Sequence, residues 1–291
     1  MIHFDAVRSN KVKSYLLLTL FVFVIIILGV AFGFMYGDPF SGLFLAGISA
    51  IIYAMISYYA GGNMILAMTG AVPADKKKYP HLVHSVEGLA IAAGISCPKI
   101  YIVHDTALNA FATGRDPEHA AVTVTTGLLK MLNREELEGV LAHEVSHIKN
   151  LDIRMMMLAA VMVGAVTLLS DFLLRSVLWG RRDQKNAGFI VVGLLLALLA
   201  PLIGQLIRLA VSREREYMAD ASAAVLTRYP KGLANALRKI SNDPDPLVDN
   251  ANKATAHLFI STPFRKKSGW LTKMFSTHPP IHDRIKRLER M

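Results

Sequence analysis

The sequence has a single cysteine, Cys97, among its 291 residues, and this scarcity limits its chemistry. An internal disulfide needs two cysteines, so none can form, which suits a reducing compartment. A structural zinc site needs a closed fourth ligand that is typically a cysteine, so one thiol argues against such a site. We therefore expect Cys97 to be a structural thiol with no chemistry of its own.

Acidic residues are also few, because 22 Asp and Glu stand against 32 Lys and Arg, for a formal net charge of +10. Such a balance can indicate nucleic-acid binding, but no nucleic-acid-binding motif accompanies it, so we expect no nucleic-acid partner. Charged residues make up only 19% of the chain and hydrophobic residues 53%, with a mean hydropathy of +0.39. This composition predicts an integral membrane protein in contact with the lipid bilayer.

Long stretches without charge define the predicted spans. Two of them, at 15–36 and 40–63, flank a turn at 37–39 and predict a transmembrane hairpin over residues 14–63. A signal peptide has a shorter apolar core, so we interpret residues 1–13 as a basic cytoplasmic tail before an uncleaved anchor. By the positive-inside rule, this tail and the lysines at 76–78 place residues 64–154 in the cytoplasm.

A second hairpin is predicted over residues 155–208. Residues 155–170 are uncharged but short for a bilayer, whereas residues 187–207 are long enough to cross it, so about four spans are expected. The basic residues at 181–185 would then lie outside, against the positive-inside tendency. The alternative is a hairpin that dips into the membrane, or lies within the protein, without crossing.

Residues 143–147 read H-E-x-x-H and carry the most chemical information. On a helix, His143 and His147 lie on one face, and Glu144 lies beside them, which is the arrangement of a zinc peptidase with the glutamate as general base. Asn133 and Glu136 form the capping-box pattern that begins such a helix. The alternative is two surface histidines and a glutamate on a solvated helix.

A third protein ligand is needed for a catalytic zinc site. The metzincin pattern is absent, because Ile153 stands where its third histidine would be. Asp152 is conceivable but is expected to point away from the histidine pair. Glu216 and Asp220 are better placed, since they share one helical face; one could bind zinc while the other hydrogen-bonds a ligand histidine. The alternative is a charged, solvated helix face.

A small antiparallel sheet is expected beside the zinc helix, because β-rich runs at 100–103 and 121–125 flank residues 109–114. The expected fold is thus a mainly α membrane protein with an α+β zincin-like cytoplasmic domain, split into residues 64–154 and 209–291. An exposed strand edge could hold an extended peptide by main-chain hydrogen bonds. The residues expected to bind substrate in this way are Asn109, Ala110, Phe111 and Ala112.

The chain resembles the HtpX-type membrane zinc metalloproteases, a gluzincin family that includes the zinc CaaX prenyl endopeptidases. The resemblance covers nearly the whole chain. It rests on the N-terminal hairpin, Asn-Ala-Phe-Ala at 109–112, H-E-x-x-H with Asn150 and Asp152 after it, R-E-Y-x-A-D at 215–220, and T-H-P-P at 277–280 with Arg284. It implies one zinc ion per chain, quality control of membrane proteins under stress, and a bacterial-type plasma membrane with the active site on the cytoplasmic side.

The resemblance also assigns roles to individual residues. It implies that His143, His147 and Glu216 bind zinc, that Glu144 is the base, and that Asp220 supports a ligand from behind. Asn150 and Arg284 are expected in supporting positions of the same kind, Arg284 by orienting a carboxylate.

The C-terminal part is less regular. His278, held before two prolines, is expected to stabilise the oxyanion of the reaction, the alternative being a solvated loop histidine. Residues 242–252 are expected to form a loop, and residues 264–275 to lie on the lipid surface or act as a lid.

The predicted function is a zinc-dependent endopeptidase that hydrolyses polypeptides, membrane proteins among them. A water activated by zinc would attack the peptide carbonyl, with Glu144 moving the proton. Two alternative functions fit the sequence less well. An intramembrane protease is disfavoured by the charged residues around the motif, and a non-catalytic membrane scaffold with a structural zinc by the lack of cysteines.

Overall fold

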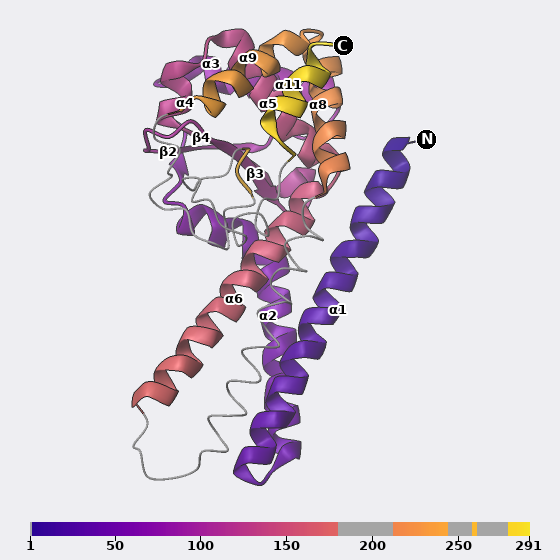
Figure 1. Cartoon of the computed structure of the whole chain (residues 1–291), viewed down its shortest axis with the longest axis vertical. Coiled ribbons are helices and arrows are strands. Elements are labelled where there is room, and N and C mark those ends of the chain that lie inside the picture. Colours follow the sequence, from indigo (N-terminus) through magenta and orange to yellow (C-terminus); the bar gives the residue numbers. More distant parts are fainter. Residues whose placement is uncertain (1, 180–211, 244–257, 261–278) are drawn as a thin grey trace.

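A computed structural model describes residues 2–179, 212–243, 258–260 and 279–291. Two long helices and part of a third extend from a domain that contains the sheet and the remaining helices (Figure 1). The predicted span at 187–207, the predicted lid at 264–275, and His278 lie outside the described residues.

The N-terminal hairpin consists of α1 (Ile2–Tyr36) and α2 (Pro39–Met68). The predicted basic tail is therefore helical, and continuous with the first span. Gly37 turns the chain at a φ of 82°, and the Asp38 side chain accepts a hydrogen bond from the Ser41 backbone at the start of α2. Gly29 and Gly42 let the two backbones approach so closely that an added Cβ would clash, as is common where membrane helices pack.

The outer face of α2 is apolar over the length of a bilayer. Large hydrophobic side chains are exposed from Phe40 to Tyr59, a rise of about 30 Å at 1.5 Å per residue. On α1 the corresponding exposed side chains begin at Val12 and Tyr15. From this apolar band, the domain-side membrane boundary is expected near Tyr59 of α2 and near Val12 of α1.

The third long helix, α6 (Asp152–Trp179), contacts both helices of the hairpin near the domain and diverges from them toward its far end (Figure 1). Its first twelve residues are buried within the protein. Among the described residues, two helices are long and apolar enough to cross a membrane, or three if the bent pair Arg134–Lys149 and Asp152–Leu168, with its 84° angle, is counted as one span. The integral membrane character is confirmed, while the expected number of four spans is not.

In the part of the chain that the structure describes, the sheet has four strands, β1 (Val72–Pro73), β2 (Lys99–Val103), β3 (Ala110–Gly114) and β4 (Ala120–Thr125), in the order β1-β2-β4-β3. The prediction of an antiparallel sheet was wrong in one pairing, because β2 and β4 are parallel. After β2 the chain passes over the end of the sheet and enters β3 at the far edge. It then reverses through the short helix η1 (Pro117–His119), so that β4 lies between β3 and β2.

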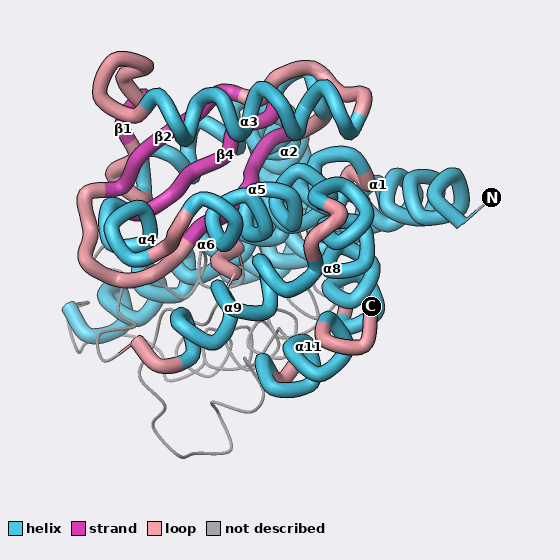
Figure 2. The backbone as a smooth tube through the Cα atoms, turned by 90° about the horizontal axis from the view of Figure 1, so that it is seen from above, coloured by secondary structure: helices cyan, strands magenta, loops and turns pink. Residues whose placement is uncertain are grey.

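Within the described residues, the domain contains six further helices: α3 (Pro80–Ala93), α4 (Thr126–Met131), α5 (Arg134–Lys149), α8 (Arg213–Thr227), α9 (Pro230–Ser241) and α11 (Ile281–Leu288). The predicted capping box is confirmed at Asn133 and Glu136. Figure 2 shows α5 between the sheet and the pair α8 and α9. Because α5 is covered on several sides, its H-E-x-x-H residues are buried, and the alternative of a solvated surface helix is wrong.

Candidate metal centre

His143 and His147 lie one turn apart on α5 and direct their rings at the same point. Their Nε2 atoms are 3.2 Å apart, and both side chains are buried. The spacing of four residues produces this convergence, since each residue of a helix advances about 100°. The two rings thus offer two nitrogen donors to one bound group.

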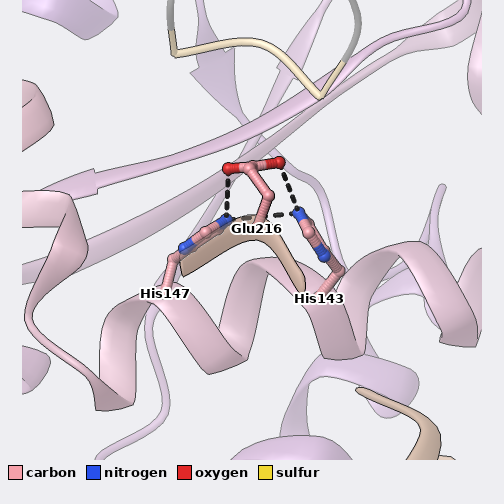
Figure 3. A group of neighbouring side chains, drawn as sticks. All are labelled: His143, His147 and Glu216. Atoms are coloured by element: carbon pink, nitrogen blue, oxygen red, sulfur yellow. Dashed lines mark hydrogen bonds and ion pairs between the residues drawn. The ribbon is translucent and has the colours of Figure 1, made fainter. Parts of the chain in front are cut away.

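Glu216 on α8 supplies the third donor, as Figure 3 shows. Its Oε1 lies 3.5 Å from Nε2 of His147, and its Oε2 lies 3.7 Å from Nε2 of His143. Helix α8 can come this close to α5 because small residues, Ala219 and Ala223 among them, are buried on its inner face. The three donor atoms form the only such His, Cys, Asp or Glu cluster found in the part of the chain that the structure describes.

These separations fit zinc. Donor atoms about 2.0–2.1 Å from a tetrahedral ion lie about 3.3 Å from one another. The two Nε2 atoms are 3.2 Å apart, which is close to that value, and each lies 3.5 or 3.7 Å from a different carboxylate oxygen of Glu216. Two imidazoles and one carboxylate are also the ligand set of catalytic zinc sites that keep one position for water or substrate.

Asp220 lies behind His143, and Arg284 lies beside both, with its Nη2 3.3 Å from Nε2 of His143. Asp220 Oδ1 is 3.0 Å from Nδ1 of His143, and the Arg284 guanidinium donates two hydrogen bonds, of 2.9 and 2.7 Å, to the same carboxylate. Arg284 Nη1 also lies 3.4 Å from Oε2 of Glu216. Asp220 and Arg284 therefore lie in direct contact with the candidate ligands, and α8 carries both Glu216 and Asp220.

Asp152 supports the other histidine, a role that the sequence reasoning missed. Its Oδ2 lies 2.9 Å from Nδ1 of His147. The expectation that Asp152 points away was wrong because helix α5 ends before it. Leu151 adopts a left-handed conformation with a φ of 60°, and this corner turns Asp152 back toward α5. A prediction that extends the helix beyond His147 cannot anticipate this corner.

Two more residues at this corner were not predicted. Asn10 of α1 donates to Oδ1 of Asp152 over 2.7 Å, and Arg215 Nη1 lies 3.5 Å from the same oxygen. The position of Arg215 next to Glu216 in the sequence could have predicted that it lies near the site. Asn10 is 142 residues from Asp152, and nothing in the sequence predicts their contact. Asn150 caps α5, and its carbonyl accepts a hydrogen bond from Asn10 over 2.9 Å.

The two histidines have different electrostatic environments. Burial and the neighbouring Arg284 lower the pKa of His143 to about 4, which keeps its ring neutral. Burial opposes charge on His147 as well, but the hydrogen bond with Asp152 and the charges of Glu216, Asp152 and Glu144 raise its pKa to about 9. The site thus holds an excess of negative charge around His147, which a divalent cation can compensate in place of a proton.

Glu144 is buried beside the three donors. Burial, together with the charge of Glu216, raises its pKa to about 7, against the opposing effects of His147 and Arg284. A backbone hydrogen bond from Ala112 of β3 also reaches its carboxylate. A carboxylate with a pKa near neutrality is suited to accept and return a proton during a reaction.

The segment predicted to bind substrate forms the outer strand of the sheet. Asn109 immediately precedes β3 and is buried, and Ala110, Phe111 and Ala112 belong to the strand. Two positions along this strand are used by the chain itself: the backbone of Ile260 donates to the Ala110 carbonyl over 3.0 Å, and the Ala112 backbone bonds Glu144. The strand packs against α5, and its bond from Ala112 reaches the residue next to His143 in sequence.

The comparisons with known proteins agree with this geometry. A model of peptidase family M48 matches residues 76–291. The chain belongs to peptidase family M48. The resemblance noted in the sequence is therefore confirmed, and this M48 chain is a membrane metalloprotease, hence a hydrolase of polypeptides. The scaffold alternative is not favoured.

Three relatives named "Protease HtpX homolog" match almost end to end. Those of Thermoanaerobacter pseudethanolicus, Dictyoglomus turgidum and Streptococcus thermophilus are 45%, 46% and 43% identical to this M48 chain, each over 99% of it and over 97%, 94% and 99% of their own lengths. The crystal structure of S. mikatae Ste24p matches with a TM-score of 0.51 at 19% identity, over 98% of this chain and 67% of that one. This structural likeness bears on the fold alone.

Proposed function

We propose that this M48 protease is a zinc endopeptidase in which His143, His147 and Glu216 hold the metal. The observation that carries the proposal is the convergence of three buried donors, with a separate carboxylate on the outer nitrogen of each histidine. Such carboxylate–histidine pairs fix the ring orientation and tautomer that a metal requires. Arg284 orients Asp220, and Asn150 belongs to the corner that orients Asp152.

The residues around the proposed metal site have different roles in peptide hydrolysis. A zinc ion at this position would lower the pKa of water from 15.7 to about 7 and polarise the scissile carbonyl. Glu144 accepts a proton from the attacking water and delivers it to the leaving amine. The edge of β3, with Asn109, Ala110, Phe111 and Ala112, aligns the substrate backbone, and His278 stabilises the oxyanion.

We further propose that the active site faces the cytoplasm of a bacterial-type plasma membrane. The exposed basic side chains Lys11, Lys13 and Lys76–Lys78 lie at the domain end of the membrane hairpin, and the positive-inside rule assigns that end to the cytoplasm. Residues 64–154 and 209–291 together form the protease domain. Membrane proteins are its proposed substrates, in quality control, because the site lies close to the membrane boundary.

Zinc content and proteolysis test the first proposal together. Purified full-length protein in detergent should contain one zinc per chain, cleave casein, lose cleavage with a chelator, and regain it with added zinc. Single substitutions of His147→Ala and Glu216→Ala should each lower the zinc content. Cleavage that persists in metal-free protein, or full zinc content in both variants, would refute the assignment.

Labelling of single cysteines tests the orientation. A maleimide that cannot cross membranes should label the exposed Cys97 in inverted vesicles but not in intact spheroplasts. The matched variant carries Cys97→Ser and Asp38→Cys, which moves the thiol to the turn of the hairpin, and it should give the opposite result. Labelling of Cys97 from outside the cell would place the active site on the wrong side.

A further inference from the structure

The first membrane helix contributes a buried polar side chain to the metal centre. Asn10 of α1 is only 2% exposed. Its Nδ2 donates over 2.7 Å to Oδ1 of Asp152 and over 2.9 Å to the carbonyl of Asn150, and its Oδ1 accepts from Arg215 Nη1 over 3.4 Å. Each hydrogen of the amide has an acceptor, and the amide oxygen has a donor. Asn10 is therefore specifically bound at this position.

These contacts join the two sides of the corner between α5 and α6. Asn150 lies on one side of Leu151, whose left-handed backbone is costly for a residue with a branched side chain, and Asp152 lies on the other. A strained corner persists only where its surroundings hold it. The Asn10 amide bonds both flanking residues at once, so it holds the corner in the conformation that directs Asp152 at His147.

The carboxylate of Asp152 is shared between the membrane helix and the candidate ligand. Oδ1 accepts the hydrogen bond from Nδ2 of Asn10, and Oδ2 lies within hydrogen-bond distance, 2.9 Å, of Nδ1 of His147. Only two hydrogen bonds thus separate α1 from the ring that offers its Nε2 to the metal. Because the carboxylate is planar, a fixed Oδ1 also fixes the direction in which Oδ2 meets the ring.

The place of Asn10 along α1 explains how the helix is held there. Asn10, Ser14, Leu17 and Phe21 are all buried and lie on one face of the helix, whereas Val12 and Tyr15 are exposed at the membrane boundary. The buried face fixes α1 against α6 and α2. The packing of α1 against α6 and α2 therefore holds the Asn10 amide at the corner.

We propose that Asn10 is a positioning residue for His147, acting through Asp152, so that α1 is part of the metal centre as well as an anchor. This inference rests on the proposed role of His147 as a metal ligand. Loss of an outer partner of a ligand histidine typically weakens metal binding by about 10–100-fold. Asn10 is one bond further away, so about tenfold is expected.

Zinc affinity of the full-length protein in lipid nanodiscs, measured by competition with a chromophoric chelator, tests the proposal. Asn10→Ala should raise the Kd for zinc about tenfold, and Asn10→Asp should raise it at least as much because it sets a second carboxylate against Asp152. The matched control is Ser14→Ala, which removes a buried hydroxyl whose bond lies within α1 itself, and its Kd should stay within twofold of the wild type.

A double variant shows whether Asn10 acts through Asp152. If it does, Asn10→Ala should raise the Kd less than threefold when introduced into Asp152→Asn, because the relay is already broken. A full tenfold rise in the Kd when Asn10→Ala is added to Asp152→Asn would show that Asn10 does not act through Asp152. The melting temperature of the metal-free protein is measured in parallel; a lower melting temperature with an unchanged Kd would leave Asn10 a purely structural residue and refute the proposal.

Two further measurements keep these outcomes distinct. Should Asn10→Ala not give folded protein, Asn10→Ser, which retains one donor, is expected to raise the Kd threefold to tenfold, and an unchanged Kd would refute the proposal. His147→Ala is measured beside them. Wild-type zinc affinity in His147→Ala would refute the proposed function itself, whereas weak binding there with wild-type binding in Asn10→Ala refutes only the present inference.

Discussion

The guanidinium of Arg284 donates two hydrogen bonds to the carboxylate of Asp220, over 2.9 and 2.7 Å, and both side chains are buried. Arg284 lies in α11, near the end of the chain, and Asp220 in α8. The pair therefore attaches the C-terminal helix to the helix that carries Glu216, and it does so directly behind His143.

Breaking this pair should destabilise the protein. Arg284→Gln leaves a buried carboxylate without its cation, which typically costs about 3–5 kcal/mol. The free energy of unfolding of metal-free protein in mixed micelles measures the loss. Arg284→Gln combined with Asp220→Asn should be less destabilised than the sum of the two single variants; additive losses would show that the two residues do not stabilise each other.

Glu144→Gln should retain zinc and lose proteolysis. The amide keeps the size of the side chain but cannot accept the proton of water, so the rate of casein cleavage should fall roughly a hundredfold to ten-thousandfold. The matched control is Glu138→Gln on the same helix, where the carboxylate pairs with the exposed Arg134 and activity should be unchanged. Wild-type cleavage by Glu144→Gln would remove Glu144 as the base.

Two glycines in helices should respond in opposite ways to alanine. A Cβ at Gly139 of α5 would lie 2.6 Å from the backbone nitrogen of Leu233 in α9, so Gly139→Ala should destabilise by about 1–3 kcal/mol. Gly88 of α3 has open space at the same position, and Gly88→Ala should stabilise by about 0.5–1 kcal/mol. Thermal unfolding of the two variants should shift in opposite directions; equal shifts would contradict the close approach of α5 and α9.

Arg228 ends α8 in the left-handed conformation, with a φ of 52° and an exposed side chain. Glycine adopts this conformation without steric cost, so Arg228→Gly should stabilise the protein by about 0.5–1 kcal/mol. Arg228→Ala is the control, since it removes the same side chain but keeps the Cβ, and no gain is expected. If alanine stabilises as much as glycine, the effect comes from the lost charge and not from the backbone.

Local patterns were sufficient for several features of this protein. The uncharged stretches predicted the hairpin, because a bilayer demands a fixed length of apolar helix. The capping box and H-E-x-x-H predicted both the start of α5 and the convergence of His143 and His147, since both depend on helical spacing alone. Asp220 was placed behind a histidine from its spacing to Glu216 and from the family resemblance.

The parallel pairing of β2 with β4 shows where local reasoning fails. The strand-forming residues of β2 and β4 were recognised, but strand order depends on how the chain crosses the end of the sheet. Alternation of side chains along a strand is the same in parallel and antiparallel neighbours. The sequence of a short strand therefore does not reveal whether the neighbouring strand runs parallel or antiparallel to it.

The sequence by itself determined the chemistry of this M48 protease: which side chains can bind a metal, which can move a proton, and which helices are apolar enough for lipid. These properties depend on residue type and on spacing within one helix. The tertiary structure alone decided that Asp152 turns back to His147 and that Asn10 meets it there. Both depend on the left-handed corner at Leu151 and on a contact between residues 142 positions apart, and no periodicity along the chain encodes either.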